Sequence, residues 1–137
     1  MSEHTRDPIV RLLQSQPLFE GLPRQTLEAL AHACPVSSFA TGYRLITENQ
    51  STPANLYIVL EGQASVTING TEVGRLQAGD LAGEISSAGI SPPVADVVAT
   101  TDMQALAIPH AVLGELAAGD ADFKQRLRRA AFARIRG

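Results

Sequence analysis

Residues 56–73 have the sequence LYIVLEGQASVTINGTEV. Positions 56–60 are continuously apolar, which is typical of a strand buried on both faces. From Ala64 to Ile68 apolar and polar residues alternate, as they do in a strand with one buried face. Asn69-Gly70 follows, the dipeptide best suited to the positive φ angles of a type I′ turn. The stretch therefore predicts two short strands, the second of which leads into a tight hairpin.

Strand-like segments continue on both sides of this stretch, over about residues 36–108. Glycines recur through it at positions 42, 62, 70, 74, 79, 83 and 89. Turn residues spaced about eight to twelve positions apart are typical of a β-sandwich or a β-barrel. Val97-Val98-Ala99 and the segment 103–108 predict the strands that close this structure.

The N-terminal segment has helical patterns instead. Asp7-Pro8 predicts a helix start, with aspartate as the N-cap and proline as the first helical residue. A second helix is predicted after Pro23, where apolar residues three and four positions apart form one stripe. These residues are Leu27, Leu30, Ala31 and Cys34. Cys34 is therefore expected to be a buried small hydrophobic residue, and His32, which lies off the stripe, is expected at the surface.

The C-terminal segment is helical again. A short helix is predicted from Pro109 to Leu116, and Asp120 is expected to cap a final helix. Three apolar residues of this final helix share one face: Phe123, Leu127 and Ala130. Phe132 points to roughly the opposite side. A helix with two apolar faces fits a lid over a ligand site or a dimer contact, and the alternative is a frayed end on which Phe132 packs locally.

The order of helices, strands and helices predicts an α+β fold with the helices segregated from the sheet. A length of 137 residues fits a single domain, residues 1–137. We divide it into N-terminal helices (1–35), a β-structure (36–108) and C-terminal helices (109–137).

The composition is that of a globular protein, with 45% hydrophobic and 18% charged residues. No apolar run approaches the roughly 20 residues of a membrane span. The polar N-terminus has no segment of the signal-peptide type, so a cytoplasmic location is expected. The single cysteine excludes an internal disulfide and a cysteine-based metal site.

Charge is unevenly distributed along the chain. Residues 124–137 contain six basic residues and no acidic residue, whereas residues 1–123 contain five basic and fourteen acidic residues. A basic end can contact nucleic acid or a partner, but the acidic body opposes non-specific binding to DNA. The interpretation we favour is a solvent-exposed helix face whose cations complement the helix dipole.

The sequence contains none of the motifs of serine hydrolases, zinc proteases or Walker-type nucleotidases. We therefore expect no catalytic residue, metal site or cofactor, and no enzyme activity. His4, His32 and His110 lie in separate segments and are expected at the surface. The remaining candidate is the glycine-bounded turn 79–87. Gly83 would let the backbone approach a ligand closely, and the free N–H groups of a helical turn after it would attract a phosphate.

Three segments, in this order, carry a family resemblance. They are PLF at 17–19, NLYIVLEG at 55–62 and LQAGDLAGEI at 76–85. The second is similar to a D-x-x-Y-x-V-x-x-G strand, and the third to the pattern L-x-x-G-D-x-F-G-E-L, with Ala82 in place of the usual phenylalanine. Over nearly its whole length the chain resembles the cyclic-nucleotide-binding domain family. The resemblance implies an antiparallel double-stranded β-helix, that is a β-roll or jelly roll, flanked by N-terminal and C-terminal helices.

The resemblance also implies a phosphate-binding cassette. In the family a glycine and helix-start amides hold the cyclic phosphate, a glutamate binds the ribose 2′-hydroxyl, and the arginine of P-R-[S/T]-A neutralises the phosphate. Gly83 and Glu84 match the glycine and the glutamate. The short helix and the closing motif fall on Ile85, Ser86, Ser87, Pro93, Val94 and Ala95. Pro93 thus stands where the family has arginine, and Val94 where it has a hydroxyl.

This departure puts the binding of an anion in doubt. The sequence between Arg75 and Lys124 contains neither lysine nor arginine. An arginine–phosphate contact contributes roughly 1.5–3 kcal/mol per hydrogen bond, so its loss weakens binding by about a hundredfold or more. Arg44, Arg75 or a C-terminal arginine would have to reach the site from elsewhere in the fold.

Two functions follow from the resemblance. The first is a regulatory ligand-sensing domain, in which cAMP, cGMP or another small ligand binds at Gly83–Ser87 and the final helix moves. The alternative is a degenerate module that has lost nucleotide binding and acts through a partner protein or homodimerisation along the final helix. A role in DNA binding is disfavoured, because relatives that bind DNA carry a helix-turn-helix domain after the roll and this chain ends at Gly137.

Overall fold

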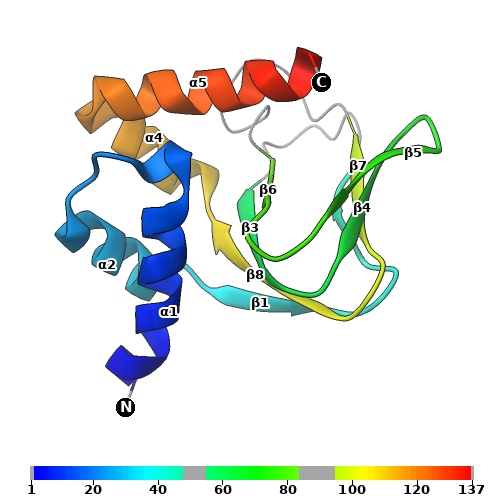
Figure 1. The fold of residues 1–137 in the computed structure, drawn as a ribbon, viewed down its shortest axis with the longest axis horizontal. Helices are drawn as coiled ribbons and strands as arrows, with labels where there is room; N and C mark the ends of the chain where they lie inside the picture. Colours follow the sequence, from blue (N-terminus) through cyan, green and yellow to red (C-terminus); the bar gives the residue numbers. More distant parts are fainter. Residues whose placement is uncertain (1, 48–54, 84–94, 137) are drawn as a thin grey trace.

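The computed structural model describes residues 2–47, 55–83 and 95–136, with side chains between Pro8 and Arg129. The helical segments α1 (Ser2–Ser15), η1 (a 3₁₀ turn, Pro17–Phe19) and α2 (Arg24–Ala33) come first. The strands are β1 (Val36–Phe39), β2 (Arg44–Ile46), β3 (Leu56–Glu61), β4 (Ala64–Ile68), β5 (Thr71–Leu76), β6 (Leu81–Ala82), β7 (Asp96–Ala99) and β8 (Met103–Ile108). Helices α4 (His110–Gly119) and α5 (Ala121–Arg136) follow. In Figure 1, α1, α2 and α4 lie to one side of the strands, and α5 runs above them.

The described strands form two four-stranded sheets, ordered β1-β8-β3-β6 and β2-β7-β4-β5, in which all pairs are antiparallel. The chain changes sheet at nearly every step, so the two sheets face each other as a roll (Figure 1). In the first sheet Leu56 lies opposite Ile108, and in the second Ser65 lies opposite Val98. The expected α+β fold, an antiparallel β-roll flanked by helices, is confirmed.

The buried residues form two cores on opposite faces of the first sheet. One core lies between this sheet and the helices and contains Leu56 and Ile58 of β3. The other lies inside the roll and contains Val59 of the same strand. Because successive side chains of a strand point to opposite faces, β3 contributes to both cores. This confirms the prediction of a strand buried on both faces.

The hairpin between β4 and β5 is also confirmed. Asn69 has φ 51° and Gly70 has φ 81°, so both central residues of the turn are in the left-handed region that a type I′ turn requires. Ile68 and Thr71 pair directly across the turn.

The predicted start of the first helix was wrong. Helix α1 begins at Ser2, and Pro8 lies inside it. Proline has no N–H to donate, so the helix loses one hydrogen bond at this point. Ile9 and Leu13 are buried in the core between the first sheet and the helices, here called the helix-side core. Their burial helps to stabilise the helix on both sides of the proline.

The remaining helix predictions have mixed outcomes. Helix α4 runs to Gly119, beyond the expected end at Leu116, and has Pro109 as its N-cap. The stripe of α2 is buried, with Cys34 1% exposed, and this burial raises the pKa of its thiol. His32 is exposed as expected. His110 is not a surface residue, because it is half-buried and its Nδ1 atom is buried, with no hydrogen-bond partner among the described residues. Among the described residues, no helix is both long and apolar enough to cross a membrane.

Candidate ligand site

Gly83 directly follows β6 and has φ +96°, a backbone conformation that only glycine adopts readily. A Cβ atom at this position would overlap the carbonyl oxygen of Asn55 and lie 3.4 Å from Cδ1 of Ile46. From its place in the sequence, Gly83 is predicted to let the backbone approach a ligand closely. In the structure, the protein's own backbone at Asn55 is what requires a glycine at this position.

The turn before β6 is held by hydrogen bonds to two other parts of the chain and by one within the turn itself. Gly79 N–H donates to the carbonyl of Val59 at 2.8 Å, and Val59 N–H donates to the carbonyl of Asp80 at 2.9 Å. Within the turn, Gln77 N–H donates to Oδ2 of Asp80 at 2.9 Å. The side chain of Gln16, between α1 and η1, donates from Nε2 to the Gly79 carbonyl at 2.7 Å. Together these bonds fix the direction in which β6 carries the chain to Gly83.

Aromatic side chains lie beside this strand. Tyr57 pairs with Ala82 in register and packs against the core inside the roll. Its ring meets the ring of Phe39 edge-on at 5.9 Å, and Phe39 lies 5.2 Å from Tyr43. Burial raises the pKa of the Tyr57 phenol, and a hydrogen bond with the side chain of Asn55 opposes that rise. The amide of Asn55, which directly precedes β3, and the phenol of Tyr57 on β3 are therefore joined beside the strand that ends at Gly83.

The other cassette residues are only partly covered by the structure. Ala95 is half-buried and directly precedes β7. The rest lie outside the described residues: Glu84, Ile85, Ser86, Ser87, Pro93 and Val94.

Three arginines that could substitute for the missing one from elsewhere in the fold are either paired or exposed. Arg75 forms an ion pair with Glu72 on β5, with Nε 3.2 Å from Oε2. Arg126 donates from Nε to the carbonyl of Leu18 at 2.9 Å. Arg44 is exposed on β2. Arg75 and Arg126 therefore already have partners within the protein.

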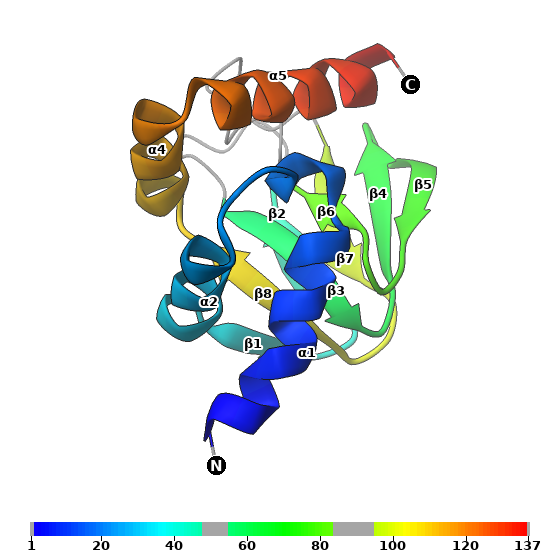
Figure 2. The ribbon, with the colours of Figure 1, turned by 60° about the vertical axis from the view of Figure 1, so that its left-hand side comes forward.

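The final helix turns its first apolar face inward. Phe123 and Leu127 are 0% and 3% exposed and belong to the core between the first sheet and the helices. The ring of Phe123 lies 5.9 Å from that of Phe19 in η1. The side chain of Phe132, the third residue proposed for a lid or dimer contact, lies outside the described residues. Figures 1 and 2 both show α5 extending from α4 towards the roll, above β6.

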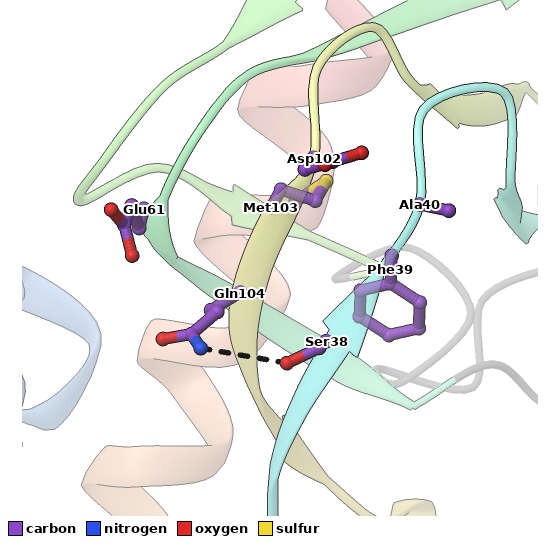
Figure 3. A pocket seen from close by; sticks show the side chains of 7 residues that line it. All are labelled: Ser38, Phe39, Ala40, Glu61, Asp102, Met103 and Gln104. Atoms are coloured by element: carbon purple, nitrogen blue, oxygen red, sulfur yellow. Dashed lines mark hydrogen bonds between the residues drawn. The ribbon is translucent and has the colours of Figure 1, made fainter.

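A surface hollow of about 380 Å³ lies at the other end of β3 from Asn55. Its lining residues are Ser38, Phe39, Ala40, Glu61, Asp102, Met103 and Gln104 (Figure 3). Gln104 Nε2 donates to Oγ of Ser38 at 3.4 Å across β8 and β1. Asp102 accepts the N–H and the hydroxyl of Thr41, each at 3.0 Å, and these bonds hold the pKa of its carboxyl below the usual value. Two carboxylates do not suit an anion, so this hollow is not the cassette.

The roll and the helix after it match a known family model. The model describes the cyclic nucleotide-binding domain and matches residues 36–120. The chain belongs to the cyclic nucleotide-binding domain family. It is therefore a regulatory domain of the cyclic nucleotide-binding type, and the position of Gly83 after β6 falls within the matched segment. No curated protein matches the sequence. Among the described residues, no group of three histidine, cysteine or acidic side chains is placed to hold a metal ion.

Solved structures support the same fold. The regulatory domain of protein kinase A from Toxoplasma gondii with cAMP is 22% identical, with a TM-score of 0.81, and the match covers 93% of this domain and 50% of that chain. The regulatory subunit of a cAMP-independent protein kinase A from Trypanosoma cruzi, bound to guanosine, is 28% identical, with a TM-score of 0.70 and coverage of 85% and 42%. This chain therefore spans only half of the Toxoplasma gondii chain and 42% of the Trypanosoma cruzi chain.

A third structure is a variant of the related Trypanosoma brucei subunit. It is 28% identical to this domain, with a TM-score of 0.69 and coverage of 82% and 45%. The variant carries three substitutions, one of which introduces an arginine, and it is bound to cAMP in the A site.

Sequence reasoning missed the residues that surround Gly83. Asn55 and Tyr57 lie in the segment 55–62, which carried the family resemblance, but neither was assigned to the site. Ile46 lies outside the three segments of that resemblance. Gln16 gave no signal, because its partner Gly79 is 63 positions away in the sequence. Each of these contacts depends on how the strands and helices pack.

Proposed function

We propose that this domain is a ligand sensor that binds a purine nucleoside, an uncharged ligand, in preference to cAMP or cGMP. The observation that carries the proposal is the absence of lysine and arginine between Arg75 and Lys124. The segment includes the whole cassette, and Pro93 stands at the position of the phosphate-binding arginine. The proposal keeps the ligand-sensing role and changes the chemical class of its ligand.

Electrostatics favour this choice. The phosphodiester of a cyclic nucleotide carries a negative charge, and burying an unpaired charge is costly. Two of the arginines considered as substitutes for the missing cation, Arg75 and Arg126, are paired with Glu72 and with the Leu18 carbonyl. A nucleoside has hydroxyl groups in place of the phosphate. Backbone N–H groups and serine hydroxyls can bind such groups without a cation.

The relatives also favour it. The Trypanosoma cruzi subunit, described as cAMP-independent, is bound to guanosine, and the arginine-containing variant of the Trypanosoma brucei subunit is bound to cAMP. Both are 28% identical to this domain. Their pattern fits a cassette whose preference between nucleoside and cyclic nucleotide depends on an arginine.

Isothermal titration calorimetry of the purified domain tests the proposal. Guanosine, adenosine, cGMP and cAMP are titrated in parallel at low and at physiological salt. We expect at least one nucleoside to bind saturably and more tightly than the cyclic nucleotide with the same base. Glu84→Ala should weaken the binding of the nucleoside, because the corresponding glutamate of the family binds the ribose 2′-hydroxyl. Arg129→Ala, an exposed position on α5, is the matched control and should leave binding unchanged.

Two outcomes would contradict the proposal. Tighter binding of cAMP or cGMP than of the nucleosides would mean that the cassette holds the phosphate without its arginine. No heat and no thermal shift with any of the four ligands at millimolar concentration would favour the alternative function, a module that acts through protein contacts or homodimerisation.

A further inference from the structure

The surface hollow at the end of β3 that is furthest from Asn55 has no part in the proposed function. We propose that it is a second ligand site, which binds a guanidinium group. The hollow has a volume of about 380 Å³, which falls within the range of small-ligand pockets. Its lining combines two carboxylates with an amide, a hydroxyl and apolar side chains, and among the described residues it includes no lysine, arginine or histidine.

Three polar side chains form a row across the first sheet inside this hollow. In the register of the sheet, Gln104 of β8 lies opposite Glu61 of β3 on one side and opposite Ser38 of β1 on the other. Residues directly opposite each other point to the same face, with Cβ atoms roughly 5 Å apart. All three side chains are exposed. Gln104 lies two residues before Leu106 of the helix-side core, so the row occupies a part of that face which the helices leave uncovered.

Hydrogen bonds determine which polar atoms of the lining are available to a ligand. Gln104 Nε2 donates to Oγ of Ser38 at 3.4 Å, which leaves Oε1 on the side of Glu61 (Figure 3). Asp102 accepts the N–H and the hydroxyl of Thr41 with the same oxygen, Oδ1, each at 3.0 Å. Its Oδ2 atom and the Glu61 carboxylate accept no hydrogen bond from another described residue. Apart from the Ser38 hydroxyl, the available side-chain atoms are therefore all acceptors.

The chemistry of this lining suits a ligand that only donates hydrogen bonds. A guanidinium group has five N–H donors in a planar fork, no acceptor and a positive charge, and it pairs with carboxylates through two parallel hydrogen bonds. Its faces are weakly hydrated, whereas an ammonium group is compact and strongly hydrated. The apolar part of the lining would therefore accept a guanidinium more readily than an ammonium group. That part comes from Phe39, Ala40 and Met103.

The two carboxylates have no cationic partner in the described part of the domain. Neither Glu61 nor Asp102 takes part in an ion pair there. Six of the eleven basic residues lie in segment 124–137. Helix α5, which contains all six, lies on the opposite side of the molecule from β1 in both views (Figures 1 and 2). A guanidinium in the hollow would thus come from outside the domain, either as a free compound or as an arginine side chain of a partner protein.

NMR of the ligand-free domain, titrated with methylguanidinium chloride at constant ionic strength, tests the proposal. We expect saturable chemical-shift changes that are confined to the amides of the hollow and its rim. N-methylurea, which has nearly the same shape and no charge, should cause none at the same concentration. Methylammonium should bind more weakly than methylguanidinium, because it is more strongly hydrated.

Substitutions locate the site. Glu61→Gln should weaken methylguanidinium binding by about fivefold, because a hydrogen bond to a neutral group replaces a charge-assisted one. Asp102→Asn should have a similar effect, since the asparagine oxygen can still accept from Thr41. Glu115→Gln is the matched control, because it removes the same charge from an exposed position on α4 outside the hollow. It should leave the titration unchanged.

A second titration distinguishes the two sources of the guanidinium. The probe is the blocked peptide acetyl-glycyl-arginyl-glycine amide, which presents an arginine side chain as a partner protein would. Tighter binding of the peptide than of methylguanidinium supports an arginine of a partner. Tighter binding of methylguanidinium supports a free guanidino compound. In either case the shifts should fall on the same amides and should be reduced by Glu61→Gln.

The proposal is overturned if the shifts do not saturate, if they spread over exposed carboxylates elsewhere, or if Glu61→Gln and Glu115→Gln give the same affinity. Should Glu61→Gln fail to fold, Asp102→Asn decides the question in its place. The test does not involve nucleosides. Failure of the hollow to bind methylguanidinium leaves the proposed function standing, and failure of the nucleosides to bind leaves the guanidinium site standing.

Discussion

At the residue scale, the proposed function predicts that position 93 sets the preference between a nucleoside and a cyclic nucleotide. We expect Pro93→Arg to strengthen cAMP binding by about a hundredfold, because a charge-assisted bidentate contact restores roughly 1.5–3 kcal/mol per hydrogen bond. The affinity for guanosine should change little, because guanosine has no phosphate for the arginine to neutralise. Calorimetry with both ligands measures the two effects on one protein preparation.

Pro93→Met is the control for this experiment, because it removes the proline ring and restores the backbone N–H without adding a charge. If Pro93→Met strengthens cAMP binding as much as Pro93→Arg does, the affinity for cAMP is limited by the missing N–H and not by the missing charge. A gain for arginine alone attributes the preference to charge, and it should shrink at high salt as the phosphate contact is screened.

Gly83 shows, also at the residue scale, which features of the candidate site could be predicted from the sequence. The sequence predicted that Gly83 lets the backbone approach a ligand, and the structure shows a different close approach, to the protein's own backbone. The partner, the Asn55 carbonyl, lies in another strand segment and is brought there by the pairing of β3 with β6. Residue types and local spacing were therefore enough to single out Gly83 as a candidate site residue. That Asn55 lies against it follows only from the pairing of the strands.

At the element scale, Asp120 fixes the start of α5. Its Oδ1 atom accepts the N–H groups of Asp122 and Phe123 at 3.0 and 3.1 Å, which satisfies two of the free donors at the helix start. Asp120→Ala should lower the free energy of unfolding by about 1 kcal/mol. Urea denaturation followed by circular dichroism measures the change.

Asp120→Asn is the matched variant, because asparagine is as good an N-cap as aspartate. It should retain nearly all of the stability of the parent domain. If both variants lose stability equally, the charge at the helix start matters and the hydrogen bonds do not.

The cap was predictable from sequence because an N-cap contacts residues two and three positions ahead. The start of α1 was not, because the burial of Ile9 and Leu13 in the helix-side core depends on tertiary packing.

At the scale of the whole molecule, β3 joins the two cores. Leu56 and Ile58 of this strand face the helices, and Val59 faces the inside of the roll. In the sequence this alternation was visible only as a continuous apolar run. The run predicted burial on both faces, and the order of helices and strands predicted the segregated layers. Which face meets the helices is set by the register of β3 on β8, in which Ile58 lies opposite Leu106. No local pattern encodes that register.

Because one strand serves both cores, the domain should unfold as a single cooperative unit. Ile58 is 0% exposed and lies on the helix side of β3. We expect Ile58→Ala to lower the free energy of unfolding by about 2–5 kcal/mol. The loss should appear equally in two probes. Far-UV circular dichroism follows mainly the helices, and tyrosine fluorescence follows the roll, because the chain has no tryptophan and its two tyrosines, Tyr43 and Tyr57, both lie there. Coincident transitions indicate two-state unfolding.

Val73→Ala is the control for the same pair of probes. Val73 is 57% exposed on the edge strand β5, so its truncation should change the free energy of unfolding by no more than about 0.5 kcal/mol. If Ile58→Ala shifts the helical transition and leaves the tyrosine transition in place, the helices and the roll unfold separately. In that case β3 would not couple the unfolding of the two cores, although it contributes buried side chains to both.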